Sequence, residues 1–154
     1  MIASSTEKIK SARTLAFEAL YEIFEKNAYA NLTIQSILRW CPLKKEERHL
    51  LTELIYGVCR KYNYCLWLIS LISDRPMFKI HPAVRILLAL GIYQIVFLDR
   101  IPESAAVNET VKIAKKVTHI GNVNLLMEFS EIFFAEGNHL RCRIELPTVS
   151  FMNL

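Results

Sequence analysis

A chain of 154 residues with 53% hydrophobic and 22% charged side chains has a globular composition and the length of one domain with one core. Its formal net charge of +4 favours a polyanionic partner, but it is too small for a tail that binds nucleic acid through charge alone. Composition therefore predicts one compact domain, and charge by itself does not identify RNA.

The first predicted helix follows a short polar lead. Its apolar side chains recur at the spacing of one helical face: Ala12, Leu15, Ala16, Ala19, Leu20, Ile23 and Phe24. Ser11 directly precedes this run and suits the N-cap position, where a hydroxyl accepts a hydrogen bond from the first turn.

Lys10, Arg13 and Phe17 share a flank of this helix at spacings of i, i+3 and i+7. Two cations beside an aromatic ring are typical of a site that contacts RNA phosphates and stacks a base. In the alternative interpretation Phe17 belongs to a wide core face and the cations are only solvated. Spacing alone leaves both interpretations open.

Two further helical stretches are predicted before residue 76. One begins at about Asn31 and ends at Cys41-Pro42, because the residue before a proline disfavours the α region. After a charged start at KKEER, the other has apolar positions at helical spacing, and Gly57 is a candidate break within it. Arg60 and Lys61 form a second candidate basic spot on this stretch, and a solvated corner is the alternative.

The central element is a core helix from Val84 to Leu98, which is apolar on every face and has Pro82 in its first turn. It is too short for a bilayer, which needs roughly 20 residues, so no membrane span is predicted. A corner at residues 99–101 leads into a helix that begins near Pro102. There a stripe of Val107, Val111, Ala114 and Val117 is predicted to pack on the core helix, with Lys112, Lys115 and Lys116 on the polar side as a secondary basic candidate.

The stretch from Val84 to Lys116 also carries an ordered set of motifs. An arginine precedes an apolar helix ending in Leu-Gly-x-Tyr-Gln, followed by Ile-Pro, Ala-Val-Asn-Glu-x-Val and a lysine; the residues are Arg85, Leu90, Gly91, Tyr93, Gln94, Ile101, Pro102, Ala106, Val107, Asn108, Glu109, Val111 and Lys115. This order resembles the NusB-like RNA-binding domain, in particular the version at the N-terminus of RsmB-type (Sun or Fmu) 16S rRNA cytosine-5 methyltransferases.

The resemblance implies an all-α fold, a NusB-like helical bundle of about six or seven helices with Val84–Leu98 at its centre. It covers residues 11–127, which we expect to form the RNA-binding domain, and leaves residues 128–154 as a divergent C-terminal tail. It also implies RNA contacts near the start of the first helix, where Ala12 and Arg13 match an Ala-Arg element. NusB itself has a denser arginine cluster there, whereas this chain offers Lys8, Lys10 and Arg13. Towards the end, Asn122 and Glu128 stand where the family has an aromatic residue and an arginine.

Catalytic motifs are missing from the sequence. Methyl transfer from S-adenosylmethionine to cytosine C5 would need a Gly-rich strand-to-helix turn and a cysteine after a proline, and the sequence has neither. The four cysteines, Cys41, Cys59, Cys65 and Cys142, contain no C-x-x-C pair, so idle thiols are expected rather than a zinc site. We therefore expect no catalytic residues, no metal and no cofactor.

These observations predict an RNA-binding domain, with ribosomal RNA as the expected partner, that lacks the methyltransferase catalytic domain. The candidate RNA-binding residues are Lys10, Arg13, Phe17, Arg60 and Lys61. The rival hypothesis is a protein-interaction module that pairs with a ribosomal or transcription-complex protein in antitermination. A cytoplasmic location is expected because the N-terminus has no apolar signal segment, and neither DNA nor a membrane is an expected partner.

Overall fold

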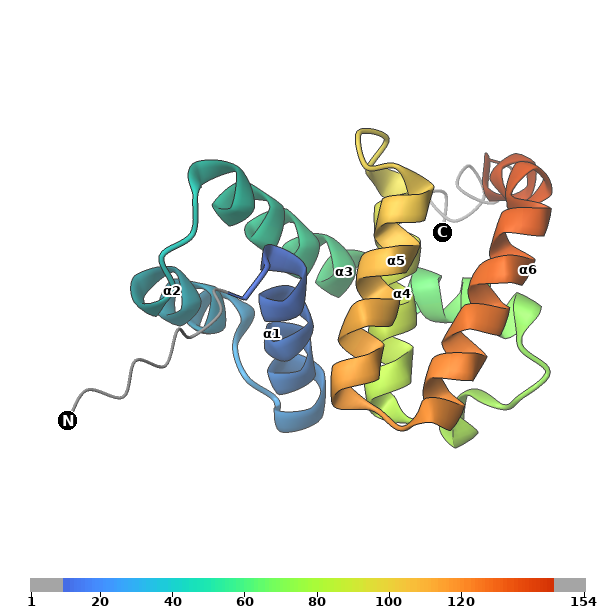
Figure 1. Ribbon diagram of the computed structural model, residues 1–154, viewed down its shortest axis with the longest axis horizontal. Coiled ribbons are helices and arrows are strands. Elements are labelled where there is room, and N and C mark those ends of the chain that lie inside the picture. Colours follow the sequence, from blue (N-terminus) through green and yellow to red (C-terminus); the bar gives the residue numbers. More distant parts are fainter. Residues whose placement is uncertain (1–9, 146–154) are drawn as a thin grey trace, which may run out of the picture. The chain divides into compact units, whose positions relative to one another are not determined.

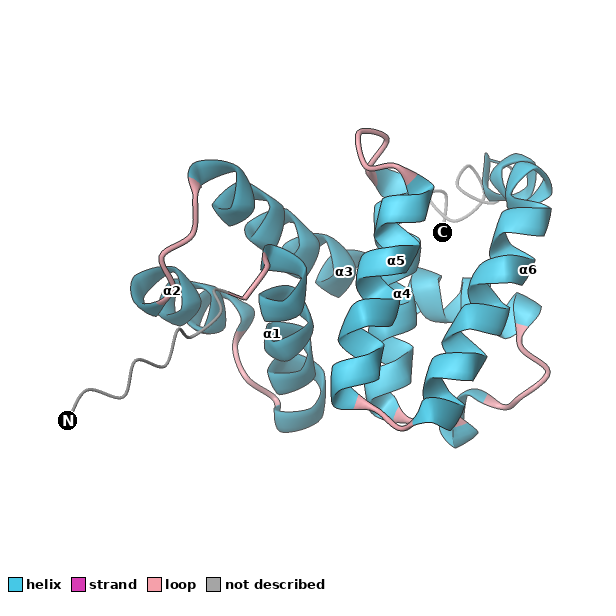
Figure 2. Ribbon diagram, in the orientation of Figure 1, coloured by secondary structure: helices cyan, strands magenta, loops and turns pink. Residues whose placement is uncertain are grey.

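The computed structural model describes the backbone of residues 10–145 and the side chains of residues 10–135. Across these residues the chain forms six α-helices and one 3₁₀ helix and no strand (Figures 1 and 2). In chain order they are α1 (Ala12–Lys26), α2 (Ala30–Trp40), α3 (Lys45–Ile72), η1 (Met77–Lys79), α4 (Pro82–Phe97), α5 (Glu103–Val117) and α6 (Ile120–Glu145). The all-α prediction is confirmed. The expectation of one compact domain is not, because the chain divides into two compact units between Lys61 and Tyr62.

The first unit contains α1, α2 and the first part of α3. Helix α1 begins as predicted, with the Ser11 hydroxyl accepting a hydrogen bond from the Thr14 backbone N–H at 3.3 Å. The helix ends at Asn27, whose left-handed φ of 56° stops the helical path. Its core face is buried at Ala12, Leu15, Ala16, Phe17, Ala19 and Leu20, and α2 packs beside it.

Helix α3 passes Gly57 without a break, so the predicted division at this glycine is wrong. A glycine weakens a helix interior by only about 1 kcal/mol. Buried apolar side chains continue at helical spacing on both sides of it and outweigh that cost: Leu51, Leu54, Ile55, Val58, Cys65, Leu68 and Ile69.

The second unit is built around α4, and the predicted core helix is confirmed within two residues at each end. Every side chain from Ala83 to Ile95 is buried except that of Arg85, which is partly exposed. Buried Gln94 satisfies its amide by donating from Nε2 to the Leu90 carbonyl at 3.0 Å. Helices α5 and α6 both pack against α4 (Figure 1).

Helix α5 differs from the prediction in the face that it buries. Pro102 is its N-cap residue, and the buried side chains are Ala106, Thr110, Ile113 and Ala114. Of the predicted stripe only Ala114 is buried, while Val117 is 45% exposed. The buried face is rotated towards Thr110, because this short side chain lets α5 approach Gly91 of α4.

Helix α6 runs through residue 127, the predicted boundary between domain and tail. Phe129 and Phe133, which fall in the predicted tail, extend this helix and are each only 5% exposed. Residues 146–154 of the predicted tail lie outside the described residues. None of the helices between residues 10 and 145 combines the length and apolarity required to cross a bilayer.

Candidate nucleic-acid interface

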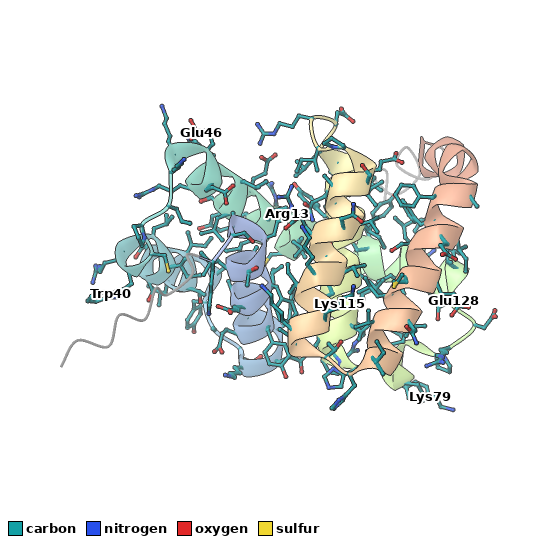
Figure 3. All side chains as sticks on the ribbon, in the orientation of Figure 1. Arg13, Trp40, Glu46, Lys79, Lys115 and Glu128 are labelled. Carbon is teal, nitrogen blue, oxygen red and sulfur yellow. The ribbon has the colours of Figure 1, made fainter. Side chains whose placement is uncertain are left out.

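The first candidate site lies at the start of α1 (Figure 3). Lys10 is exposed, and its Nζ contacts both carboxylate oxygens of Glu18, at 2.8 and 3.1 Å. Arg13, one residue into the helix, is partly buried. The third expected cation, Lys8, lies outside the described residues. The positive charge of this region is thus partly neutralised within the protein.

Two backbone amides at this helix end already have acceptors. Ala12 donates its N–H to Oε2 of Glu47 at 2.9 Å, and Thr14 donates to Ser11. Glu47 therefore places a carboxylate where an RNA phosphate would meet the positive end of the α1 dipole.

Phe17 does not offer a ring for base stacking. Its side chain is only 5% exposed, and its ring centroid lies 6.2 Å from that of Tyr21 in a tilted arrangement. The stacking role is therefore wrong for this structure, and the core-face interpretation agrees with the burial.

Arg60 and Lys61 are exposed on α3. The hydrogen bond from Ala12 to Glu47 places the start of α1 beside the first turn of α3. Arg60 follows Glu47 by thirteen positions, a rise of roughly 20 Å along the helix. Arg60 and Lys61 thus lie further along α3 than the turn that contacts the start of α1.

A second group of basic and polar side chains was not singled out from the sequence. Lys45, Arg48, His49 and Thr52 lie at i, i+3, i+4 and i+7 on one face of α3, and with Leu38 and Leu43 they line an open groove of about 520 Å³. The side chains of Lys45, Arg48 and His49 make no ion pair or hydrogen bond to any residue that the structure describes. The sequence signal was present as this spacing within KKEERHLLT, but the apolar wall comes from α2 and from the α2–α3 connection.

The lysines of α5 behave as a solvated face. Lys112, Lys115 and Lys116 are exposed, and Lys112 pairs with Glu109 at 2.8 Å (Lys115 is labelled in Figure 3). Glu128, which replaces a family arginine, is exposed on α6. Within the described residues no cluster of His, Cys, Asp and Glu has the arrangement of a metal site.

Comparison with known proteins gives three concordant similarities. The model of the NusB family matches residues 10–125. The "Probable ribosomal RNA small subunit methyltransferase B" of Synechocystis sp. (strain ATCC 27184 / PCC 6803 / Kazusa) is 42% identical over 105 residues, which make up 68% of this chain and 24% of that protein. The protein of the same name from Bacillus subtilis (strain 168) is 37% identical over 114 residues, 74% of this chain and 25% of that protein.

The solved structure of T. maritima NusB superposes with a TM-score of 0.72 at 20% sequence identity, covering 81% of this chain and 89% of that one. At this identity the likeness shows the fold. The chain spans about a quarter of the length of the methyltransferases that it matches.

Proposed function

Because the chain belongs to the NusB family, we propose that it binds RNA, and that its target is ribosomal RNA of the small subunit. The observation that carries this proposal is that the region shared with the two methyltransferases is the same region that matches the family model. Both relatives are named for a reaction on ribosomal RNA of the small subunit. A domain shared with them over a quarter of their length is best explained as an RNA-recognition part.

The proposed role is recognition without catalysis. The sequence lacks the Gly-rich cofactor turn and the Pro-Cys nucleophile that methyl transfer to cytosine C5 would need. The chain would bind RNA in the cytoplasm, where small-subunit RNA is found, and would need a catalytic domain to modify it.

Lys10 and Arg13 at the start of α1, and Arg60 and Lys61 on α3, are the proposed phosphate contacts in the first unit. Arg13 and Arg60 each offer a planar fork that suits a phosphate, and Arg13 also matches the Ala-Arg element of the family. If it contacts one phosphate of a single-stranded segment, Arg13→Ala should weaken binding and reduce the slope of log K against log[salt] by ~0.7.

Filter binding of small-subunit rRNA fragments across a salt series measures both quantities. Lys112→Ala is the matched control, because it removes one exposed cation that is already paired on α5. Circular dichroism and a urea midpoint for each variant establish that the fold is retained. If folded Arg13→Ala keeps the affinity and salt slope of the parent, Arg13 does not contact RNA.

A protein partner is the second candidate function, and α2 supports it. This helix exposes Leu32 by 57% and Trp40 by 77%, and Tyr29, just before it, is 73% exposed. Large apolar side chains with this exposure are typical of interaction surfaces. This function would be favoured if a ribosomal or transcription-complex protein binds the wild-type chain and binds Leu32→Ser more weakly. The wild-type chain should then show no RNA binding.

A further inference from the structure

We propose that the groove lined by Leu38, Leu43, Lys45, Arg48, His49 and Thr52, here called the α2–α3 groove, is a second RNA-binding site that holds backbone phosphates of a single strand. This inference rests on the proposed RNA-binding function. It adds a site in a different place from Arg13 and from the exposed cations near residue 60.

Unpaired charge is the first argument. Lysine and arginine side chains on a helix surface commonly pair with carboxylates three or four positions away. Lys10, Lys26 and Lys112 pair with glutamates at 2.7 to 2.8 Å, whereas Lys115 and Lys116 on α5 have no ion pair with a described residue and do not line the α2–α3 groove. Lys45, Arg48 and His49 have no such partner among the described residues and face the same groove.

The neighbouring carboxylates lie on other faces of α3. At about 100° per residue, Glu46 and Glu53 project roughly 90–110° away from the middle of the groove face, and Glu47 projects about 150° away. Glu47 is engaged with Ala12 on the α1 side. The groove therefore keeps its positive charge although acidic residues are adjacent in sequence, and it selects an anion.

The shape of the groove favours a single strand over a small anion. Its volume of about 520 Å³ exceeds that of one phosphate, and one wall is formed by the apolar side chains of Leu38 and Leu43. Trp40, the last residue of α2, is 77% exposed. A positively charged groove that follows the backbone is a usual feature of single-strand binding.

The groove and the start of α1 flank the same turns of α3. Since a helix with its side chains is about 10–12 Å across, a strand of several nucleotides could pass from Arg13 over the beginning of α3 into the groove. Each of the two sites would then add its own contribution to the salt dependence of the RNA affinity.

The test is a salt titration with a short oligouridylate, using Lys45→Ala/Arg48→Ala, Arg13→Ala and the combination of all three substitutions. The double variant should reduce the slope of log K against log[salt] by ~1.4, and the triple variant by ~2.1, since each phosphate contact to a single strand contributes ~0.7. Arg48→Lys should recover most of the slope lost by Arg48→Ala, because it restores the charge. Lys26→Ala, which removes an exposed lysine paired with Glu22 on α1, is the matched control.

Fluorescence provides an independent readout. Trp40 and Trp67 are the two tryptophans of the chain, so Trp67→Phe leaves Trp40 as the reporter. Oligouridylate should change the Trp40 emission in this background, and the change should disappear with Lys45→Ala/Arg48→Ala. Circular dichroism of every variant verifies the helical fold.

The outcomes separate the two proposals. If the groove variants reduce the salt slope while Arg13→Ala leaves it unchanged, the result supports RNA binding in the groove. It also excludes the site at the start of α1. If Arg13→Ala reduces the salt slope while the folded groove variants keep the affinity and slope of the parent, the groove is not a binding site. RNA binding at the start of α1 would then be retained. A wild-type chain that binds neither oligouridylate nor rRNA overturns both, and a groove that binds only an acidic peptide overturns the RNA assignment.

Discussion

Two glutamates determine the charge that the start of α1 presents to a ligand. Glu18 pairs with Lys10 from eight positions along the chain, and Glu47 reaches Ala12 from thirty-five positions away. The sequence predicted the cations, the N-cap and the helix, because these depend on neighbouring residues. It could not predict which carboxylate each group would meet, because the Glu47 contact exists only once α1 and α3 pack.

Burial changes the pKa of two groups that the proposed function does not use. Desolvation raises the pKa of the Cys59 thiol above its ordinary value of 9.0. Desolvation, and to a smaller extent the nearby Cys65, raises the pKa of the Tyr64 hydroxyl above 10.0. In both cases the fold favours the neutral, protonated form.

The protein should therefore lose stability as the pH rises above about 9. An unfolded thiol ionises near its ordinary pKa, whereas folded Cys59 retains its proton, so the unfolded state binds fewer protons and gains from alkaline conditions. The stabilising contribution is fully present below pH 9.0 and is lost as the pH passes through the raised pKa. Thermal unfolding at a series of pH values should show a Tm that falls above pH 9.

Cys59→Ala should make that alkaline decline shallower, whatever its effect on Tm at neutral pH. Cys41→Ala serves as the comparison, since this thiol is also free and partly exposed. A Tm that rises between neutral and alkaline pH would contradict the assignment.

At the scale of elements, the contact between α4 and α5 explains where sequence reasoning failed. The buried stripe on α5 was predicted from apolar residues, so valines were chosen for the buried face and Thr110 was not. In the structure Thr110 is 3% exposed, because its hydroxyl donates to the Ala106 carbonyl at 2.7 Å and its small side chain faces Gly91. Close approach of two helices depends on size, which hydrophobic periodicity does not report.

Gly91→Ala should stabilise the second unit. A Cβ at this position would lie 3.5 Å from Oγ1 of Thr110, an ordinary van der Waals distance, and a void of about 20 Å³ borders the same residue. Alanine in a helix interior is better than glycine by about 0.5–1 kcal/mol. Urea denaturation should show a gain of this size at an unchanged m-value.

Gly91→Leu tests how much space lies between α4 and α5 at this position. Its side chain exceeds the available space and should cost about 1–3 kcal/mol through overpacking. Equal destabilisation by alanine and leucine would mean that α5 lies closer to α4 than the structure places it.

For the whole molecule, the family resemblance predicted the fold better than the local patterns did. The starts of α1 and α4 followed from a capping serine and from Pro82, whereas the all-α bundle followed from the resemblance. The division into two compact units did not follow, since the separation falls inside α3, where the sequence shows neither a linker nor a change of pattern. The α2–α3 groove was missed for a related reason, because its walls come from three segments.

The isolated chain should not bind S-adenosylmethionine. This prediction follows from the missing Gly-rich turn and nucleophile in the sequence and from the all-helical structure of the described residues. Isothermal titration calorimetry should show no saturable heat, and the Bacillus subtilis protein named as a probable methyltransferase provides the comparison. Micromolar binding by this chain would show that it contains a cofactor site that its motifs do not reveal.

The unbroken course of α3 has a consequence for proteolysis. Separate units in a chain are usually joined by an exposed, irregular linker, which is where proteases cut first. Here the join falls at Arg60 and Lys61, two residues that trypsin recognises, but both are held within a helix of 28 residues. Cleavage there requires several turns to unwind, so trypsin should first attack the irregular segments at Lys44 and Arg100, and fragments released by digestion would not correspond to the two units.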